Sequence, residues 1–132
     1  MANANLGIHE DIVPKIKELR MKRKHQWLRL GLNEAETEVV VHEEGAPKST
    51  WDDLLKSCPK DCASFLVWDD APTNKVVGIY YSDDNLKAQK KMVGSAAWIQ
   101  VRSLFEGNGI GKNIDAHDDQ DMAYENISRK FK

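Results

Sequence analysis

The stretch between residues 62 and 81 constrains the fold more than any other part of the sequence. Residues 62–68, CASFLVW, and residues 75–81, KVVGIYY, are rich in β-branched and aromatic side chains, which is typical of strands. The connection between them, DDAPTN, is short and rich in turn-forming residues. The two strands are therefore predicted to form a tight antiparallel hairpin.

Sequence periodicity predicts further helices and strands on both sides of this hairpin. Apolar residues at helical spacing and helix-capping residues predict helices within four ranges: 9–24, 45–58, 85–106 and 118–132. Alternating or β-branched segments predict three more strands: 27–32, 37–43 and a short one within 109–116. The second helix is expected to be capped by Ser49 or Thr50, with Asp53 in its first turn. The order α-β-β-α-β-β-α-β-α predicts an α/β (α+β) fold, a small mixed β-sheet flanked by helices on both faces.

Composition and charge indicate a single globular domain but do not specify its function. The 132 residues, with no internal repeat or linker, predict one domain spanning residues 1–132. A net charge of -2 gives no overall attraction to nucleic acid or to a membrane surface, and no apolar run is long enough to cross a bilayer. The opening residues lack the layout of a signal peptide, so an intracellular, cytoplasmic protein is expected. Cys58 and Cys62 are expected to be reduced, because a metal site would need further ligands at suitable spacing.

The long predicted helix over residues 85–106 carries two apolar faces. At 100° per residue, the expected core face consists of Leu86, Val93, Ala97, Val101 and Leu104. Nearly opposite lie Ala88, Met92, Ser95 and Ile99, flanked by Lys91 and Arg102. Such a second face is typical of a helix that binds a partner, although loops or the terminal helix could equally cover it. Gly94 either permits a close backbone approach or has no particular role.

The order of these elements and several sequence blocks resemble the actin-depolymerising factor/cofilin family, whose domain is called the ADF-homology domain. The most specific block is residues 38–69, with a strand, a Gly-x-Pro loop, an aromatic-Asp-Asp helix and a cysteine that opens the next strand. Residues 80–92, YYSDDNLKAQKKM, resemble the family's aromatic strand end, Ser-x-Asp turn and Lys-Met helix start, and residues 121–130 resemble its terminal helix. Residues 1–7 are similar to its short flexible arm.

The resemblance implies an actin-binding protein of the cytoskeleton that has no catalytic centre, cofactor or metal. The arm and long helix are expected to enter a cleft on the actin monomer, and the candidate residues there are Gly7, Ile8, Gln89, Lys91, Met92, Ser95 and Trp98. The hairpin and terminal helix are expected to hold the neighbouring filament subunit through Lys75, Arg129 and Lys130. The family also binds phosphoinositides, for which the candidates are Lys87, Lys90, Lys91 and Lys112. A monomer that prefers ADP-actin, severs filaments and promotes their turnover is implied.

Departures from the family pattern concern both surfaces. Gln89 stands where the family has a basic residue, and Trp98 either offers an aromatic anchor or packs under a neighbouring loop. The hairpin connection is shorter than is common in the family, and Arg129 stands where an acid is common, so these departures affect the filament-side contact, and with it severing, more than monomer binding. No Ser, Thr or Tyr precedes Thr37, which predicts that an arm-phosphorylation switch is absent.

Three alternatives stay open at this point. The protein could mainly sequester actin monomers and sever weakly, given its short hairpin. It could be a small phosphate- or nucleotide-binding enzyme that uses the glycine loop at residues 107–113, although Glu106 and Asn113 replace the first glycine and the hydroxyl residue of a P-loop. It could be an adaptor domain that binds actin-like proteins or their nucleating complex.

Overall fold

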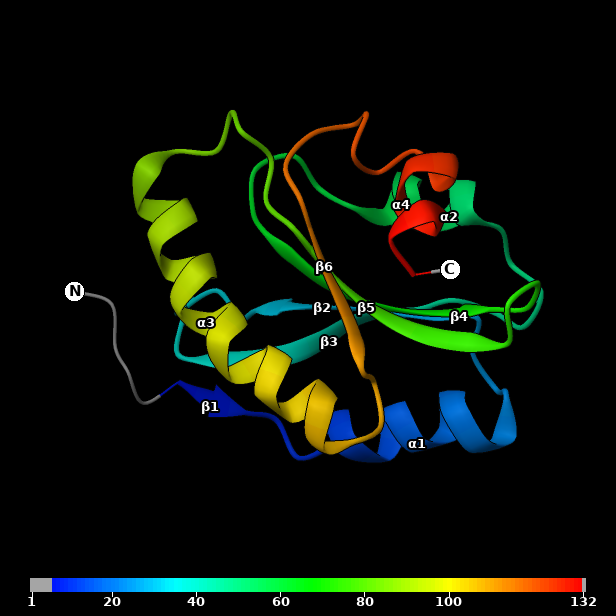
Figure 1. Ribbon diagram of the computed structural model, residues 1–132. Helices are drawn as coiled ribbons and strands as arrows, with labels where there is room; N and C mark the ends of the chain where they lie inside the picture. The colour runs from blue at the N-terminus through cyan, green and yellow to red at the C-terminus, as the bar shows by residue number, and fades with distance from the viewer. Residues whose placement is uncertain (1–5, 132) are drawn as a thin grey trace.

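The fold is known from a computed structural model, which describes residues 6–131 (Figure 1). These residues form six strands and four helices. The strands are β1 (Gly7–Ile8), β2 (Trp27–Leu32), β3 (Glu38–Glu44), β4 (Ser64–Asp70), β5 (Lys75–Tyr81) and β6 (Lys112–Ala116). The helices are α1 (Ile12–Lys22), α2 (Trp51–Ser57), α3 (Ala88–Gly107) and α4 (Tyr124–Phe131). None of the helices in residues 6–131 is long and apolar enough to cross a membrane.

The strands make one mixed sheet in the order β1-β3-β2-β4-β5-β6. Its centre is antiparallel, and the predicted hairpin of β4 and β5 pairs in continuous register from Ser64 opposite Tyr81 to Asp70 opposite Lys75. Both outer strands, β1 and β6, run parallel to their neighbours. The fold is therefore the predicted α+β class with a small mixed sheet.

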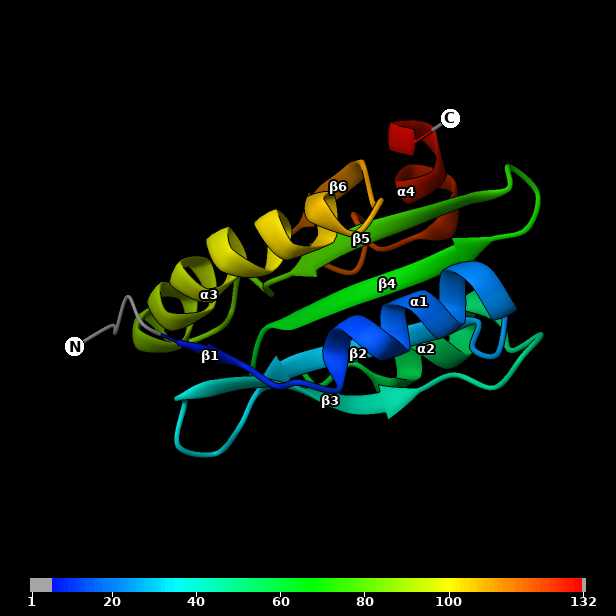
Figure 2. The same ribbon diagram turned by 90° about the horizontal axis from the view of Figure 1, so that it is seen from below.

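The helices cover both faces of this sheet, as predicted. Figure 2 shows α1 and α3 together on one face, with α2 on the opposite face. Alternation along the strands supplies two separate cores, because successive side chains point to opposite faces. One core joins α1 and α3 to residues such as Leu28 and Phe65, and the other joins α2 and α4 to residues such as Leu66 and Ile79.

The N-terminal segment differs from the prediction. A helix was predicted within residues 9–24, but α1 begins only at Ile12, and the chain before it forms the strand β1, which includes Ile8. The amide of Gly7 donates to the carbonyl of Thr37 at 2.9 Å, so the chain continues the sheet edge before it turns into the helix. Leu6 is buried, and residues 1–5 of the predicted arm lie outside the described residues. Two residues of strand carry too little periodicity to be predicted from sequence.

Helix α2 begins as its sequence indicates. Thr50, not Ser49, is the N-cap residue: its hydroxyl accepts a bond from the Asp53 amide at 3.2 Å, and the Asp53 carboxylate accepts one from the Thr50 amide at 2.9 Å. The hydrogen bond from the Thr50 amide to this carboxylate lowers the pKa of Asp53. The terminal helix is shorter than predicted. It starts at Tyr124, and the acidic residues before it form a turn in which the Asp118 carboxylate accepts a bond from the Asp121 amide at 2.7 Å.

Candidate functional site

Helix α3 has a buried face and an exposed apolar face. The buried residues are Gly94, Ala97, Trp98, Val101 and Phe105. The core stripe is therefore turned relative to the prediction, because Val93 and Leu104 are only half-buried. On the far side, Met92 is 54% exposed and Ile99 is 73% exposed, so neither a loop nor the terminal helix within residues 6–131 covers them. The predicted second apolar face is confirmed as an open surface.

Gly94 lets α3 lie close against the sheet. A Cβ atom at this position would sit 2.7 Å from the Tyr80 hydroxyl and 3.0 Å from Cβ of Ala63, which is closer than such atoms normally approach. Of the two roles that the sequence allowed for Gly94, the structure selects the close backbone approach. This packing fixes the rotation of α3 and so determines which side chains face outward.

Trp98 belongs to the core. Its ring stacks on Tyr80 with centroids 5.3 Å apart and on Phe65 at 6.2 Å, and it meets Phe105 edge-on at 6.0 Å. It is only 7% exposed. Of the two roles that the sequence allowed, the structure selects packing, and Trp98 leaves the candidate surface. The aromatic cluster instead anchors the helix that carries the surface.

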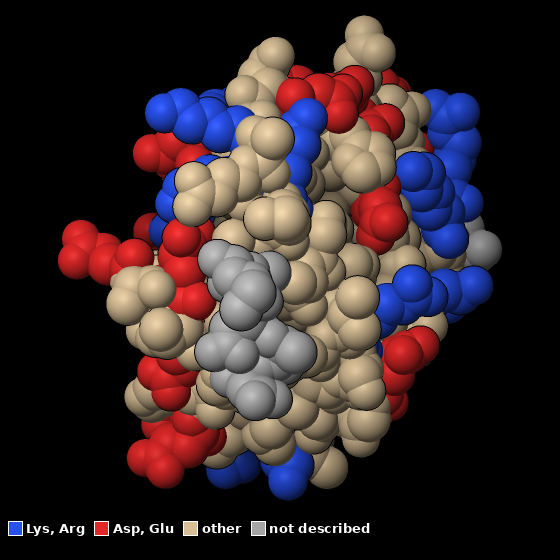
Figure 3. All heavy atoms as spheres, turned by 90° about the vertical axis from the view of Figure 1, so that its left-hand side faces the viewer, with Lys and Arg blue, Asp and Glu red and all other residues tan. Residues whose placement is uncertain are grey.

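The remaining candidates on α3 lie together on its outward side. Gln89, Met92 and Ser95 are exposed, and Lys91 is half-buried beside them. Figure 3 views the molecule from this side and shows a broad uncharged area with basic and acidic side chains gathered around its edge. Such an apolar centre with a charged rim is the usual anatomy of a protein interface.

Strand β1 brings Ile8 to the same side of the molecule as α3. Ile8 and Ile99 line a shallow groove of about 560 Å³, together with Ser103 and Leu104 of the helix. The parallel pairing of β1 with β3 holds Ile8 opposite Val39. The structure thus brings the arm candidate Ile8, which follows Gly7 in β1, to the long helix. The contribution of Ile99 was visible as an exposed apolar position but was not assigned to the site from sequence.

The hairpin and α4 form a second, separate candidate surface. The ammonium of Lys75 donates to the carbonyl of Phe131 at 2.8 Å, which places a cation at the C-terminal end of α4. Arg129 is exposed and donates to the Glu125 carbonyl at 3.2 Å and to the Asn126 side chain. Lys130 is exposed beside them. Lys75 therefore contacts the last turn of the helix that carries Arg129 and Lys130, and this contact is structural.

A buried carboxylate joins the hairpin to α4. Asp70 is fully buried and accepts hydrogen bonds from the Trp68 indole at 3.1 Å, the Thr73 hydroxyl at 2.7 Å and the Tyr124 hydroxyl. Burial of Asp70 opposes its ionisation, but these hydrogen bonds outweigh it and lower the pKa of the carboxyl group. Burial and the bond to Asp70 raise the pKa of Tyr124 to about 12. The hairpin and α4 are thus held as one unit.

The predicted phosphoinositide residues do not form one cluster. A pocket of about 370 Å³ lies at the start of α3, and its basic lining residues are Lys60, Lys87 and Lys90. Lys112 follows the far end of this helix, which has 20 residues and therefore measures about 30 Å. Lys112 lines a different groove of about 490 Å³, whose other basic residues are Arg20, Arg23 and Lys75. This groove was not predicted from the sequence, because its cations come from separate segments of the chain.

The glycine loop at residues 107–113 closes α3. Gly109 has a φ of 89°, and the guanidinium of Arg20 packs against it while donating to the Asn108 carbonyl at 2.9 Å. This is the geometry of a helix end fixed by a neighbouring helix.

Residues 6–131 contain no group of three or more His, Cys, Asp or Glu side chains that could hold a metal ion. The two cysteines are free, and burial raises the pKa of Cys58 to about 11, which makes its thiol unreactive.

Comparison with known proteins identifies the family of the chain. Residues 5–132 match the family model described as cofilin/tropomyosin-type actin-binding protein. Actin-depolymerizing factor 4 of Oryza sativa subsp. japonica is 28% identical over 141 residues, with 100% of both chains covered. Actophorin of Acanthamoeba castellanii is 22% identical over 98% of this chain and 96% of its own. Among solved structures, Streptomyces griseoflavus cofilin has the same fold, with a TM-score of 0.81 and 22% identity over 96% of this chain and 99% of that one.

Proposed function

The chain belongs to the cofilin/tropomyosin-type family of actin-binding proteins, and from this premise we propose how it engages actin. It is an actin-binding protein of the depolymerising kind, associated with the actin cytoskeleton. We propose that it uses two surfaces, one for a monomer and one for the neighbouring subunit of a filament. We also propose that it acts as a cytoplasmic monomer that catalyses no reaction.

The monomer-binding surface is proposed to be the outward side of α3 together with β1. One observation carries this proposal: Met92 and Ile99 are large apolar side chains that the fold leaves more than half exposed on the same helix. Exposed apolar side chains of this size in an uncharged area mark a protein-binding surface. Lys91 adds a cation beside Met92, and the thioether of Met92 adapts to an irregular partner surface. Gln89 and Ser95 add polar contacts, and Gly7 and Ile8 extend the surface.

The filament-side surface is proposed to be the hairpin turn with α4. Lys75, Arg129 and Lys130 place three cations there, and Asp70 holds the two elements together. A protein that binds one filament twist or nucleotide state more tightly shifts the filament toward it. We infer that binding prefers ADP-actin and that bridging two subunits in an altered twist promotes severing and monomer loss.

Cosedimentation with ADP-actin filaments tests the two-surface proposal. Both proteins are measured in pellet and supernatant over a concentration series. If both surfaces work, the protein pellets with filaments at low ratios and moves actin to the supernatant at higher ones.

Monomer sequestration is the second candidate, and the short connection from Ala71 to Asn74 favours it, because it offers little surface to a second subunit. A sequestering protein depletes the actin pellet without entering it. A protein that alters neither distribution with a cognate actin contradicts both candidates and leaves the adaptor role.

Phosphoinositides are proposed as competitors of actin. Lys87 and Lys90 are exposed at the start of α3, next to Lys91, which would serve both ligands. Lys112 would contribute a separate contact. Vesicles that contain phosphoinositides are expected to release the protein from actin, whereas neutral vesicles are expected to have no effect.

A further inference from the structure

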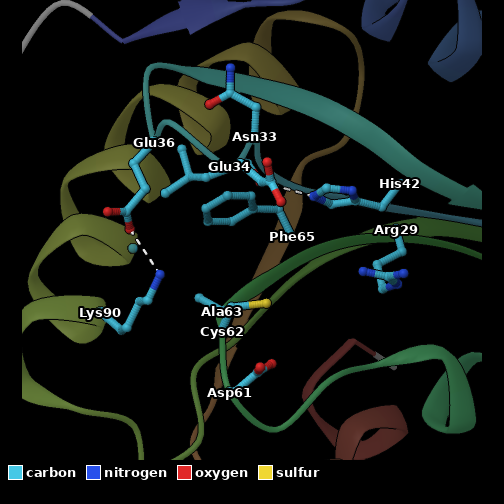
Figure 4. A pocket seen from close by; sticks show the side chains of 12 residues that line it. Arg29, Asn33, Glu34, Glu36, His42, Asp61, Cys62, Ala63, Phe65 and Lys90 are labelled. Atoms are coloured by element: carbon cyan, nitrogen blue, oxygen red, sulfur yellow. Dashed lines mark hydrogen bonds and ion pairs between the residues drawn. The ribbon is translucent and has the colours of Figure 1, made fainter.

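A cavity of about 360 Å³ lies beside α3, and none of the residues proposed to contact actin line it. Its walls come from β2, β3 and the turn between them, from the start of β4 and the loop before it, and from the first half of α3. Figure 4 shows Arg29 on one side of this cavity and Lys90 on the other, with Cys62 between them. These segments are far apart in the sequence, so the cavity exists only in the folded protein.

Arg29 is the unusual residue of this cavity. It is half-buried on β2, and its Nε atom is buried without a hydrogen-bond partner. Within residues 6–131, its guanidinium makes neither a hydrogen bond nor an ion pair. Two other arginines have partners: Arg23 binds both carboxylate oxygens of Asp69 at 2.7 and 2.8 Å, and Arg20 donates to the Asn108 carbonyl. A partly buried cation without a counterion is costly, because burial removes water that nothing replaces.

The acidic residues of the cavity do not neutralise Arg29. Glu36 pairs with Lys90, whose ammonium lies 3.4 Å from its carboxylate. Glu34 and Asp61 are exposed, and neither lies within ion-pair distance of the Arg29 guanidinium. The fork of donors on Arg29 is therefore free, while the other charges are paired or solvated.

The wall beside Arg29 is closely packed. The ring of His42 lies over Gly31, where a Cβ atom would come within 2.7 Å of it, and the His42 Nε2 atom lies 3.0 Å from the Leu32 carbonyl oxygen. On the other side, Gly94 brings α3 against Tyr80. Fixed walls of this kind preserve the shape of a site and reduce the entropy lost when a ligand binds.

We propose that this cavity binds a compact oxyanion, a carboxylate or a phosphate group, through the guanidinium of Arg29. Two parallel N–H donors of arginine match two oxygens of such a group. The anion supplies the missing counterion and the hydrogen-bond acceptors that Arg29 lacks. The site does not depend on the actin-binding role, because it lies beside the exposed face of α3 and not on it.

A titration followed by amide NMR tests this proposal. Inorganic phosphate and acetate are added separately to the full chain at ionic strength held constant with sodium chloride. The amides of Gly31, Cys62 and Gly94 are expected to shift together along one saturating curve for at least one anion. The two titrations distinguish phosphate from carboxylate recognition. Shifts that stay linear, or that occur only near Lys112, would overturn the proposal.

Two arginine variants make the result specific. Arg29→Met keeps the side-chain stem and removes the charge, and it is expected to weaken the anion response at least tenfold. Arg102→Met removes an exposed arginine of α3 and is expected to leave it unchanged. An unchanged response in Arg29→Met contradicts the proposal. If Arg29→Met does not fold, Arg29→Gln is used with the same expectations.

Thermal unfolding gives a second readout. Phosphate or acetate is expected to raise the Tm of the unmodified protein and of Arg102→Met, since a ligand of the folded state stabilises it. The Tm of Arg29→Met is expected not to respond. An equal rise in Arg29→Met would mean that the anion acts elsewhere on the protein.

Discussion

At the scale of single residues, the environment of a side chain decides its role more than its type does. Trp98 and Met92 lie on the same helix, and both could serve as contacts for a partner. Trp98 is enclosed by three aromatic rings, whereas Met92 is more than half exposed. We therefore expect exposed Met92 to contribute to the binding energy with a partner, and buried Trp98 to contribute to the stability of the fold.

Gly94→Ala tests the close approach of α3 to the sheet. The new methyl group would collide with the Tyr80 hydroxyl, and we expect a loss of roughly 1–2 kcal/mol in the free energy of unfolding, because overpacking outweighs the better helix propensity of alanine. Chemical denaturation measures this change. Gly107→Ala is the control, since nothing lies within 4 Å of its Cβ position, and it is expected to lose no stability. If Gly94→Ala is as stable as Gly107→Ala, the close approach does not limit the packing.

The pair Lys91→Ala and Met92→Ala tests the monomer-binding surface. The double variant is expected to bind ADP-actin monomers at least about tenfold more weakly, because both side chains are expected at the centre of the interface. Its Tm is expected to stay the same. Binding is measured by fluorescence titration of labelled monomers. The matched control is Met21→Ala with Lys22→Ala, an exposed Met-Lys pair on α1. Equal binding by the two double variants would show that the outward side of α3 is not the monomer site.

At the scale of secondary-structure elements, each proposed surface is held in place by a contact between elements, here called a tie. β1 holds Ile8 beside the second half of α3 through the edge of the sheet, and Asp70 holds α4 to the hairpin through Tyr124. Each proposed surface therefore combines segments from distant parts of the chain. Loss of a tie should affect one surface and leave the other intact.

Tyr124→Phe tests this separation. The variant removes one hydrogen bond from buried Asp70, and we expect it to lose about 1–3 kcal/mol of stability and to loosen α4 from the hairpin. Pelleting with filaments is expected to fall several-fold more than monomer binding does. Arg129→Ala with Lys130→Ala removes the proposed charges without touching this tie. If filament binding fails in the charge variant but persists in Tyr124→Phe, the tie is not needed for that surface.

At the scale of the whole molecule, buried and paired carboxylates determine the response to acid. The pKa of Asp70 is lowered in the folded protein from its ordinary value of 3.8, as are those of Glu18, Asp53 and Asp119. A lowered folded pKa means that the unfolded chain binds protons first as the pH falls. The stabilisation by these groups is therefore complete above their unfolded values and is lost as the pH falls through the folded values.

Acid unfolding tests this linkage. The free energy of unfolding is expected to decrease steadily below about pH 5, which lies just above the unfolded pKa values of carboxyl groups. Denaturant titrations at a series of pH values measure the slope. Asp70→Asn removes one of these groups, so its slope is expected to be shallower than that of the unmodified protein. Parallel slopes would indicate that Asp70 does not contribute to the acid response.

Much of the fold and part of the site were predictable from sequence, because they depend on local pattern. The β4–β5 hairpin, the capped start of α2, the extent of α3 and its exposed apolar side follow from turn chemistry, capping and periodicity. The family resemblance in residues 38–69 and 80–92 identified actin as the partner, which the family match supports.

Only the tertiary structure decided the features that depend on contacts between distant segments. It placed Trp98 in the core, turned the buried stripe of α3 toward Gly94, added β1 to the sheet and separated Lys112 from Lys87. It also left Arg29 without a counterion beside a cavity. Periodicity reports which face of an element is apolar, but not which neighbour covers that face or which charge finds a partner, since both are settled when the elements pack together.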